Sequence, residues 1–175
     1  MHNIILMGPP GAGKGTQSEK ILKYLNVPHI STGDMFREAI ANKTELGKLA
    51  ESYIQAGALV PDEVTIGLVK ERLSCPDCKN GYLLDGFPRT LKQAEALKAL
   101  TKEISREVNI VINIACDYSI LTKRISGRRV CSKCGNSYHV ETKKPSIDGI
   151  CDSCGGELIQ RKDDTVEALK VRLDA

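Results

Sequence analysis

The apolar residues of this chain gather in short continuous runs separated by segments of helical spacing. Residues 4–7, 82–85 and 110–114 form such runs, which are typical of strands buried in a parallel sheet. Apolar residues at three- and four-residue spacing indicate helices over residues 14–25, 91–104 and 121–125. The alternation predicts a doubly wound α/β fold, in which helices flank a parallel sheet.

Two stretches interrupt this alternation. Residues 31–60 read as short helices, and residues 127–164 contain four cysteines. We interpret both as insertions into a core made of residues 1–30, 61–126 and 165–175. Ligands bind at the carboxyl ends of the strands in such sheets, so insertions that leave those ends can fold over a ligand as lids. We call residues 31–60 the helical insertion and residues 127–164 the lid segment.

Composition and charge narrow the function classes. The 175 residues carry a net charge of +3, with basic and acidic residues interspersed, so bulk electrostatics does not favour nucleic-acid binding. The apolar run at the N-terminus is broken by Pro9 long before it reaches the length of an export signal or a membrane span. We therefore expect a cytoplasmic protein, monomeric by default, with no membrane and no nucleic acid among its partners.

A glycine-rich loop follows the first predicted strand and opens the first predicted helix. Its backbone N–H groups can surround a polyphosphate at the helix N-terminus. Lys14 would reach the β- and γ-phosphates, and Thr16 would lie near Mg²⁺. The alternative, a plain turn with a solvated lysine, fits the strand and helix context poorly. The predicted ATP contacts in this loop are Gly11, Ala12, Gly13, Lys14, Gly15 and Thr16.

Asp85 ends the second of the apolar runs. With a phosphate loop at the same edge of the sheet, its carboxylate is placed to bind Mg²⁺-coordinated water. The alternative role for Asp85 is to cap the loop that follows.

Four cysteines in the lid segment have the spacing of a zinc site. Two C-x-x-C pairs lie sixteen residues apart, which suits tetrahedral coordination by four thiolates. Four protein ligands leave no open position, so the metal would be structural. Two disulfides are the weaker alternative in a chain without an export signal, and iron can replace zinc during expression. The predicted ligands are Cys131, Cys134, Cys151 and Cys154.

The other cysteines do not suggest a metal site. Cys75 and Cys78 form a C-x-x-C pair without a second pair or nearby histidines, so we interpret them as structural. Cys116 reads as a buried small apolar residue.

Together with the loop, the segments 85–90 (DGFPRT) and 31–37 (STGDMFR) resemble adenylate kinases, in order along the whole chain. The Gly-Lys-Gly-Thr form of the loop is that of nucleoside monophosphate kinases. The resemblance implies the P-loop nucleoside monophosphate kinase fold with a helical AMP-binding insertion and a zinc-bearing lid, a variety frequent in Gram-positive bacteria. It also implies the reaction ATP + AMP = 2 ADP, with Mg²⁺ bound alongside ATP.

By this resemblance, the cations Lys14, Arg89, Arg124, Arg128, Arg161 and Arg172 serve phosphoryl transfer together with Asp85. No strong general base is needed, because the attacking phosphate oxygen is already anionic, so catalysis rests on positioning and charge neutralisation. Arg128, Ser137 and Tyr138 correspond to further ATP contacts. The implied AMP site comprises Thr32, Arg37, Ala58, Leu59, Val60, Gly86, Phe87, Pro88, Arg89, Gln93, Arg161 and Arg172.

Local alternatives remain for several of these residues. Thr90 and Gln93 also fit a capping box, and Thr32 also fits a helix N-cap. Arginines on helices are usually solvated, and Arg129 has no implied role beyond structure.

Three rival functions stay open at this point. Another nucleoside monophosphate kinase, acting on UMP or CMP, would share the phosphate-binding residues, although Gln93 and the long lid favour AMP. A zinc-ribbon nucleic-acid module would need a basic, aromatic-rich surface. The third rival is a poorly active nucleotide-binding fragment. The family continues beyond Ala175 with another strand, so we expect an open sheet edge, exposed apolar surface, weak stability and impaired ATP binding.

Overall fold

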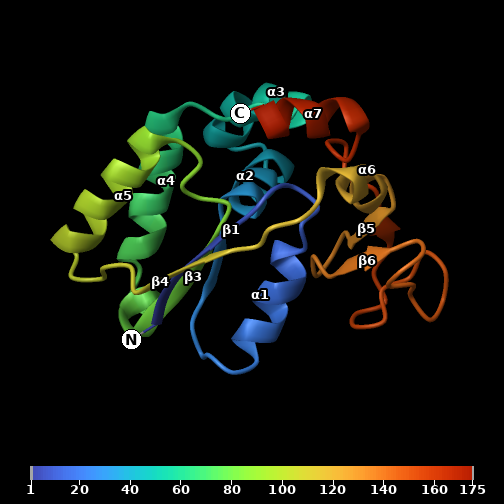
Figure 1. Ribbon diagram of the computed structural model, residues 1–175, viewed down its shortest axis with the longest axis horizontal. Coiled ribbons are helices and arrows are strands. Elements are labelled where there is room, and N and C mark those ends of the chain that lie inside the picture. The colour runs from blue at the N-terminus through green and yellow to red at the C-terminus, as the bar shows by residue number, and fades with distance from the viewer. Residues whose placement is uncertain (1, 175) are drawn as a thin grey trace.

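The computed structural model describes residues 2–174, and its centre is a four-stranded parallel sheet in the order β2-β3-β1-β4 (Figure 1). Strands β1 (His2–Met7), β3 (Gly81–Asp85) and β4 (Ile110–Asn113) coincide with the predicted apolar runs. The short strand β2 (His29–Ser31) was not among them. All side chains of β3 and the four central side chains of β1 are buried, as expected for strands covered on both faces.

Pairing register brings the ends of three strands together. Asp85 lies opposite Leu6 of β1 and opposite Ser31 of β2. The loop after β1, the helix after β2 and the segment after β3 therefore leave the sheet at a single edge. This edge is where open α/β sheets bind their ligands.

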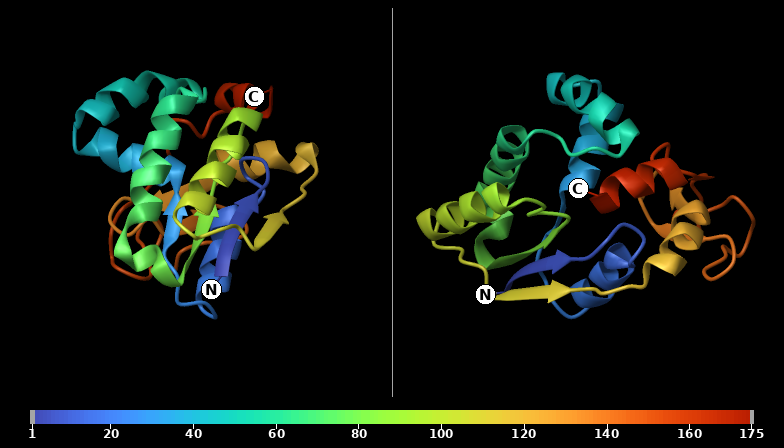
Figure 2. Two further views of the ribbon diagram at one scale, coloured as in Figure 1. Left: turned by 90° about the vertical axis from the view of Figure 1, so that its left-hand side faces the viewer. Right: turned by 45° about the horizontal axis from the view of Figure 1, so that its top comes forward.

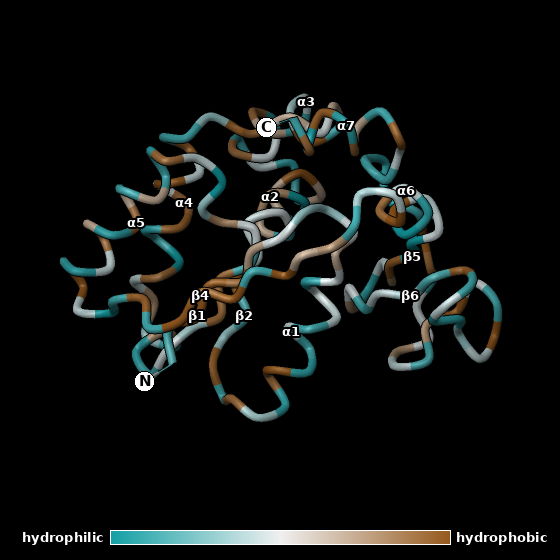
Figure 3. The backbone as a smooth tube through the Cα atoms, in the orientation of Figure 1, coloured by the Kyte–Doolittle hydropathy of each residue, from teal (hydrophilic) through white to brown (hydrophobic). Residues whose placement is uncertain are grey.

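Helices cover the sheet from both faces (Figure 2). On one side, α4 (Asp62–Ser74) and α5 (Leu91–Glu103) lie side by side, and Val69, Leu73 and Leu97 pack with Leu84 in the main core. On the other side, α1 (Lys14–Leu22) contacts β1 and β3. The strands form the most hydrophobic part of the chain in Figure 3, which matches their position between the helical layers.

The helical insertion consists of α2 (Thr32–Ala41) and α3 (Glu45–Ala56), as predicted. Ser31 and Thr44 cap these helices, since their hydroxyls accept hydrogen bonds from backbone N–H groups in the first turns. Phe36 and Ala50 bury the interface between the two helices, together with Val60 from the segment that returns to the sheet. Ser31, rather than Thr32, is therefore the N-cap.

The lid segment begins after α6 (Tyr118–Ser126) and forms a small antiparallel sheet of β5 (Arg128–Cys131), β6 (Ser137–His139) and β7 (Leu158–Ile159), in the order β6-β5-β7. The chain then continues into α7 (Val166–Asp174), which packs against α6 and α3. In Figure 2, α7 lies between the lid and the helical insertion. The division into core, insertion and lid as separate units remains a proposal.

The outer edge of the sheet is open and apolar, as expected. β4 hydrogen-bonds to β1 on one side and has no strand partner on the other within residues 2–174. Ile110, Val111 and Ile112 are 46%, 56% and 36% exposed. In the same described part of the chain, no helix is long and apolar enough to span a membrane.

The cysteines outside the lid occupy two structural positions. Cys78 lies in the 3₁₀ helix η1 (Pro76–Asn80), fully buried, and burial raises the pKa of its thiol to about 11. An inert buried thiol agrees with the structural interpretation of this pair. The interpretation of Cys116 was wrong in one respect, because this residue is only half-buried and its Sγ lies 3.4 Å from Nη1 of Arg124.

The contrast between β3 and β4 yields a stability prediction. Leu84 is fully buried, so Leu84→Ala should lower the free energy of unfolding by about 2–5 kcal/mol through lost transfer energy and the cavity left behind. Val111→Ala, on the exposed edge, should cost less than about 1 kcal/mol. Urea unfolding followed by circular dichroism measures both, and equal losses would contradict the assignment of the core.

Candidate active site

The glycine-rich loop joins β1 to α1 in the predicted place. Gly13 is the N-cap of α1 with φ = 101°, a left-handed conformation that favours glycine. The side chain of Lys14 folds back over the loop, and its Nζ donates hydrogen bonds to the carbonyl oxygens of Gly8 at 2.9 Å and Pro9 at 3.2 Å. The ammonium group therefore lies above the concave side of the loop, where an anion would bind.

Lys14 lies within a concentration of positive charge. Burial lowers its pKa, the charges of Arg89, Arg128 and Arg172 lower it further, and the carboxylate of Asp85 acts in the opposite direction. Burial also lowers the pKa of Arg89, with Arg172 and Arg37 adding to the effect. Cations from the loop, the sheet edge, the lid and α7 thus lie in one region, whereas the catalytic role of Lys14, Arg89, Arg128 and Arg172 stays a prediction.

Arg161, which leaves the lid, joins this group. Its pKa is lowered to about 10 by burial and by the nearby charges of Arg37 and Arg128. Because burial and neighbouring cations disfavour the charge of Arg161, a bound anion would stabilise it. The region therefore favours a ligand with several negative charges.

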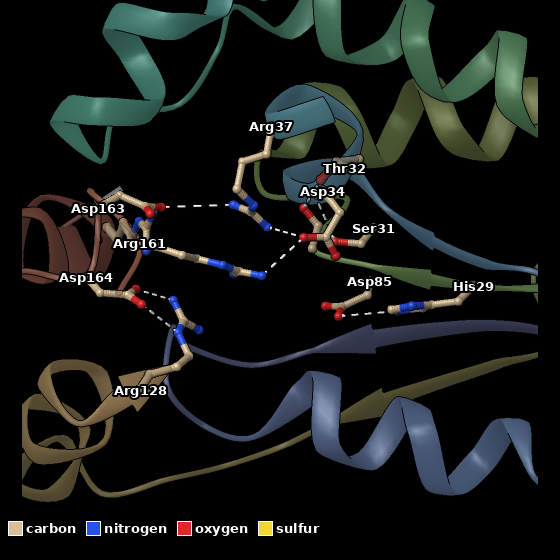
Figure 4. Close-up of polar contacts among 12 residues, drawn as sticks. His29, Ser31, Thr32, Asp34, Arg37, Asp85, Arg128, Arg161, Asp163 and Asp164 are labelled. Carbon is tan, nitrogen blue, oxygen red and sulfur yellow. Dashed lines mark hydrogen bonds and ion pairs between the residues drawn. The ribbon is translucent and has the colours of Figure 1, made fainter. Parts of the chain in front are cut away.

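Buried aspartates hold most of these arginines in place (Figure 4). Asp164, with a fully buried side chain, makes a bidentate pair with Arg128, whose Nε donates at 2.9 Å. Asp163 pairs with Arg172 and lies 4.0 Å from Arg37. Burial by itself raises the pKa of Asp163, but Arg172 and Arg37 outweigh it, so the net pKa lies below its ordinary value.

Asp34 of α2 links the helical insertion to the lid. Its Oδ1 accepts hydrogen bonds from Nη2 of Arg37 at 2.5 Å and from Nη2 of Arg161 at 3.3 Å. Figure 4 shows both guanidinium groups directed at this one carboxylate.

Three of the predicted cations lack such a partner. Within residues 2–174, Lys14, Arg89 and Arg124 form no ion pair with a carboxylate and hydrogen-bond to carbonyl oxygens instead. Arg89 donates to Gly86 at 2.8 Å, and Arg124 donates to Ala12 of the loop at 3.3 Å. Asp85 acts on Lys14 and Arg89 only from beyond ion-pair distance, so positive charge dominates the space between the loop and Arg89 and suits it to phosphate groups.

Asp85 faces this space from the end of β3. Its side chain is about one-tenth exposed, and its Oδ2 lies 3.6 Å from Nε2 of His29 on β2 (Figure 4). Asp85 does not cap the following loop through any side-chain hydrogen bond in the described part of the chain. A carboxylate beside a phosphate loop, in contact with a single imidazole, is compatible with the water-mediated Mg²⁺ role predicted for it.

A pocket lies on the other side of Arg89, between the helical insertion and the segment after β3. Its lining includes Thr32, Ala58, Leu59, Val60, Gly86, Arg89 and Gln93, all predicted for the AMP site, together with Gly33, Phe36, Ile54 and Thr65, which were not predicted. Phe87 does not line it, because its side chain is buried in the main core. The pocket is apolar at its wall and cationic at its mouth.

Gln93 belongs to the predicted cap of α5, whereas its contact with AMP stays a prediction. Thr90 caps α5, since its hydroxyl accepts from the N–H of Gln93 at 3.1 Å. The Gln93 side chain is nearly fully buried, donates Nε2–H to Asp62 at 2.7 Å and accepts from the N–H of Arg89 at 2.8 Å. One amide hydrogen and one lone pair stay free, enough to pair with the edge of a base.

The lid cysteines come together as a potential metal centre. The sulfur atoms of Cys131, Cys134, Cys151 and Cys154 all lie within 4.8 Å of one another, and none forms a disulfide. A tetrahedral zinc ion with Zn–S bonds of about 2.3 Å needs sulfur separations of about 3.8 Å, so the cluster fits zinc. A hydrogen bond from the Tyr138 hydroxyl lowers the pKa of Cys151 to about 6, which favours the ligating thiolate.

Tyr138 has a structural task in the lid as well. Its side chain is buried, and its hydroxyl also accepts from the N–H of Asp152 at 2.8 Å, so a nucleotide would meet the backbone at this position. Ser137, which pairs with Val130 at the start of β6, stays a predicted ATP contact. Arg129 donates to the backbone carbonyls of Ser126 and Arg128, in agreement with a structural role.

Sequence reasoning missed the aspartates that organise the site. Asp163 and Asp164 are adjacent in a charged stretch and look like solvated residues, although they are among the most buried charged residues described. The useful signal was their proximity along the chain to Arg161 and Arg172, since buried arginines need carboxylate partners. Asp62, which anchors Gln93, had no comparable signal.

The comparisons with known proteins agree with this site. A family model described as adenylate kinase matches residues 6–175. The chain is 57% identical over 172 residues to an adenylate kinase from Bacillus cytotoxicus and 56% identical to those from Bacillus thuringiensis and Bacillus anthracis. Each match covers 98% of this chain and 80% of the relative. With these matches, and with the glycine-rich loop and the arginines that converge at the sheet edge, this chain belongs to the adenylate kinase family.

Proposed function

We propose that this protein catalyses the reversible transfer of the γ-phosphoryl group of Mg·ATP to AMP, giving two molecules of ADP. One observation carries the proposal. The glycine-rich loop and the pocket of the helical insertion lie on either side of Arg89, and neither Arg89 nor Lys14 forms an ion pair with a carboxylate of the described residues. This arrangement suits two nucleotides whose phosphates meet end to end.

ATP would bind with its phosphates along the loop from Gly11 to Thr16, while Lys14 exchanges its contacts with the loop carbonyls for the β- and γ-phosphates. AMP would insert its base beside Gln93 and the Ala58–Val60 backbone. Its phosphate would then lie against Arg37 and Arg89. The acceptor oxygen is held in line with the γ-phosphorus by these contacts alone.

The chemical step needs charge neutralisation rather than proton abstraction. Negative charge spreads over the transferring group, and the guanidinium groups of Arg128 and Arg172 are held by buried carboxylates before the ligand arrives. Little reorganisation is then required during the reaction. Mg²⁺ would neutralise the β- and γ-oxygens, and Thr16 and the water-binding carboxylate of Asp85 are the residues suited to hold it.

Zinc in the lid would act on the fold and not on the reaction. Four thiolates fill a tetrahedral site, so no position is left for substrate. The apolar core of the lid consists of little more than Tyr138 and Leu158 around two of the cysteines, which is too small to fold without a metal. A monomeric cytoplasmic enzyme agrees with this function.

Lys14→Ala should lower kcat with AMP by roughly 10²–10³-fold, because the cation that meets the transferring phosphate is lost. Lys20→Ala, at an exposed position on the same helix, should leave turnover unchanged. A coupled assay of ADP formation, run with AMP, UMP, CMP and GMP as acceptors, measures the effect. Preference for UMP or CMP would make the protein a different nucleoside monophosphate kinase, and nucleotide binding without turnover would make it an inactive fragment.

Asp164→Asn should reduce the free energy of unfolding by about 2–3 kcal/mol, because Arg128 loses its buried partner beside other cations. Added inorganic phosphate should recover more thermal stability in this variant than in the parent protein, since it supplies the missing negative charge. Asp148→Asn, in an exposed part of the lid, is the matched control. An equal response to phosphate in both variants would refute this account of the arginine cluster.

Cys134→Ser should abolish stoichiometric zinc binding and lower the melting temperature by roughly 5–10 °C. Cys75→Ser, in the C-x-x-C pair outside the lid, should keep one zinc per chain. Elemental analysis together with differential scanning calorimetry tests both variants. Zinc loss from Cys75→Ser, or its retention in Cys134→Ser, would place the metal elsewhere.

A further inference from the structure

The imidazole ring of His139 lies at the junction between α6 and the lid. His139 ends β6 and pairs with Arg128 across the lid sheet. The next residue, Val140, donates its N–H to the carbonyl of Gly127, the residue between α6 and β5, at 2.9 Å. The ring thus sits where the lid leaves the core, and no role has been assigned to it so far.

The hydrogen bonds of the ring fix its tautomer. Nδ1 accepts from the backbone N–H groups of Glu141 at 3.1 Å and Thr142 at 3.3 Å, so this nitrogen carries no proton. Nε2 therefore carries the proton and donates it to the carbonyl of Lys123, in the last turn of α6, at 3.2 Å. One neutral side chain connects the turn after β6 to the end of the preceding helix.

Gly127 provides the space for this contact. A Cβ at this position would lie 2.4 Å from Nε2 and 2.6 Å from Cε1 of His139, closer than van der Waals contact allows. Gly127 has φ = −83°, so its backbone would accept other residues and the requirement for glycine comes from the ring alone. The imidazole of His139 therefore packs directly against the backbone of Gly127, in space that any larger residue at position 127 would fill.

We propose that His139 is a positioning residue, which fastens the base of the lid to α6 and thereby sets the distance between Arg124 and Arg128. Arg124 is next to Lys123 on α6 and contacts the phosphate loop, whereas Arg128 lies on the strand paired with His139. The two arginines belong to the two elements that the ring connects. Their role in ATP binding rests on the proposed function, but the fastening itself does not.

Three replacements of His139 separate the two halves of the contact. In the Asn variant, a short acceptor replaces Nδ1, but the side chain cannot reach the carbonyl of Lys123. The Gln variant has a longer side chain whose N–H can donate to that carbonyl. The Phe variant keeps a ring but can form neither hydrogen bond. Phe and Asn should raise KM for ATP by roughly two- to tenfold, the ratio that one net hydrogen bond represents, and Gln should restore part of the loss. KM for AMP should stay unchanged, since the AMP pocket contains no lid-base residue. Parent-like KM for ATP in the Phe or the Asn variant would overturn the proposal.

A double-mutant cycle tests the fit between ring and glycine. Gly127→Ala should raise KM for ATP in the parent protein and have no further effect in a His139→Ala background, where no ring remains to be displaced. Additive effects in the cycle would show that Gly127 and His139 act separately and would refute the inference.

Two readouts are independent of turnover. Nitrogen-15 NMR of the imidazole should show a protonated Nε2 and an unprotonated Nδ1 at pH 8, and hydrogen exchange of the Val140 amide should accelerate in His139→Phe but not in His139→Gln. If the parent protein were inactive, the proposed function would fail while these two measurements still decided the inference. The opposite tautomer, or equal exchange in all variants, would overturn it.

Discussion

Repulsion among like charges is the constraint on which the rest of this structure depends. A lysine and five arginines from the loop, the helical insertion, the sheet edge, the lid and α7 influence one another electrostatically in one region, and burial makes their charges more costly. Asp34, Asp163 and Asp164 compensate for part of this charge, at the arginines of the insertion, the lid and α7. Within residues 2–174, Lys14 and Arg89 form no ion pair, although the carboxylate of Asp85 partly offsets their charge. Structural ion pairs and an excess of positive charge beside the loop are thus two parts of a single electrostatic balance.

The fold could largely be predicted from the sequence because three of its strands are continuous apolar runs, two of them, β1 and β3, buried on both faces. Continuous apolar runs at residues 4–7, 82–85 and 110–114 left little ambiguity, and helical spacing identified α5 and the helices of the insertion. Strand β2 was not predicted, because three residues are too few to show a periodic pattern of apolar positions. Its place in the sheet comes from its pairing with β3. Caps were harder to assign, since neighbouring hydroxyls at 31 and 32 both suit an N-cap and only backbone geometry decides between them.

The candidate site was predictable where chemistry imposes a spacing, as in the glycine-rich loop and the paired cysteines. It was not predictable where a role depends on contacts distant in the sequence. Gln93 depends on Asp62, thirty-one residues away, and Asp34 meets an arginine 127 residues away. Phe87 is the opposite case: it belongs to a recognisable motif, but its side chain packs in the hydrophobic core and not in the pocket. Sequence patterns identify the backbone of a site better than the direction of each side chain.

The lid contacts the rest of the molecule through polar groups. Its connections include the pairs Arg161–Asp34, Arg172–Asp163 and Lys143–Glu19 and the imidazole contact with α6, whereas its own apolar residues surround the cysteines. Swinging such a unit away from the core uncovers little hydrocarbon, so the heat capacity of opening is small. The enthalpy of opening is then nearly independent of temperature, whereas the balance between open and closed forms depends strongly on ionic strength. A rise in the salt concentration around the protein would therefore favour the open lid.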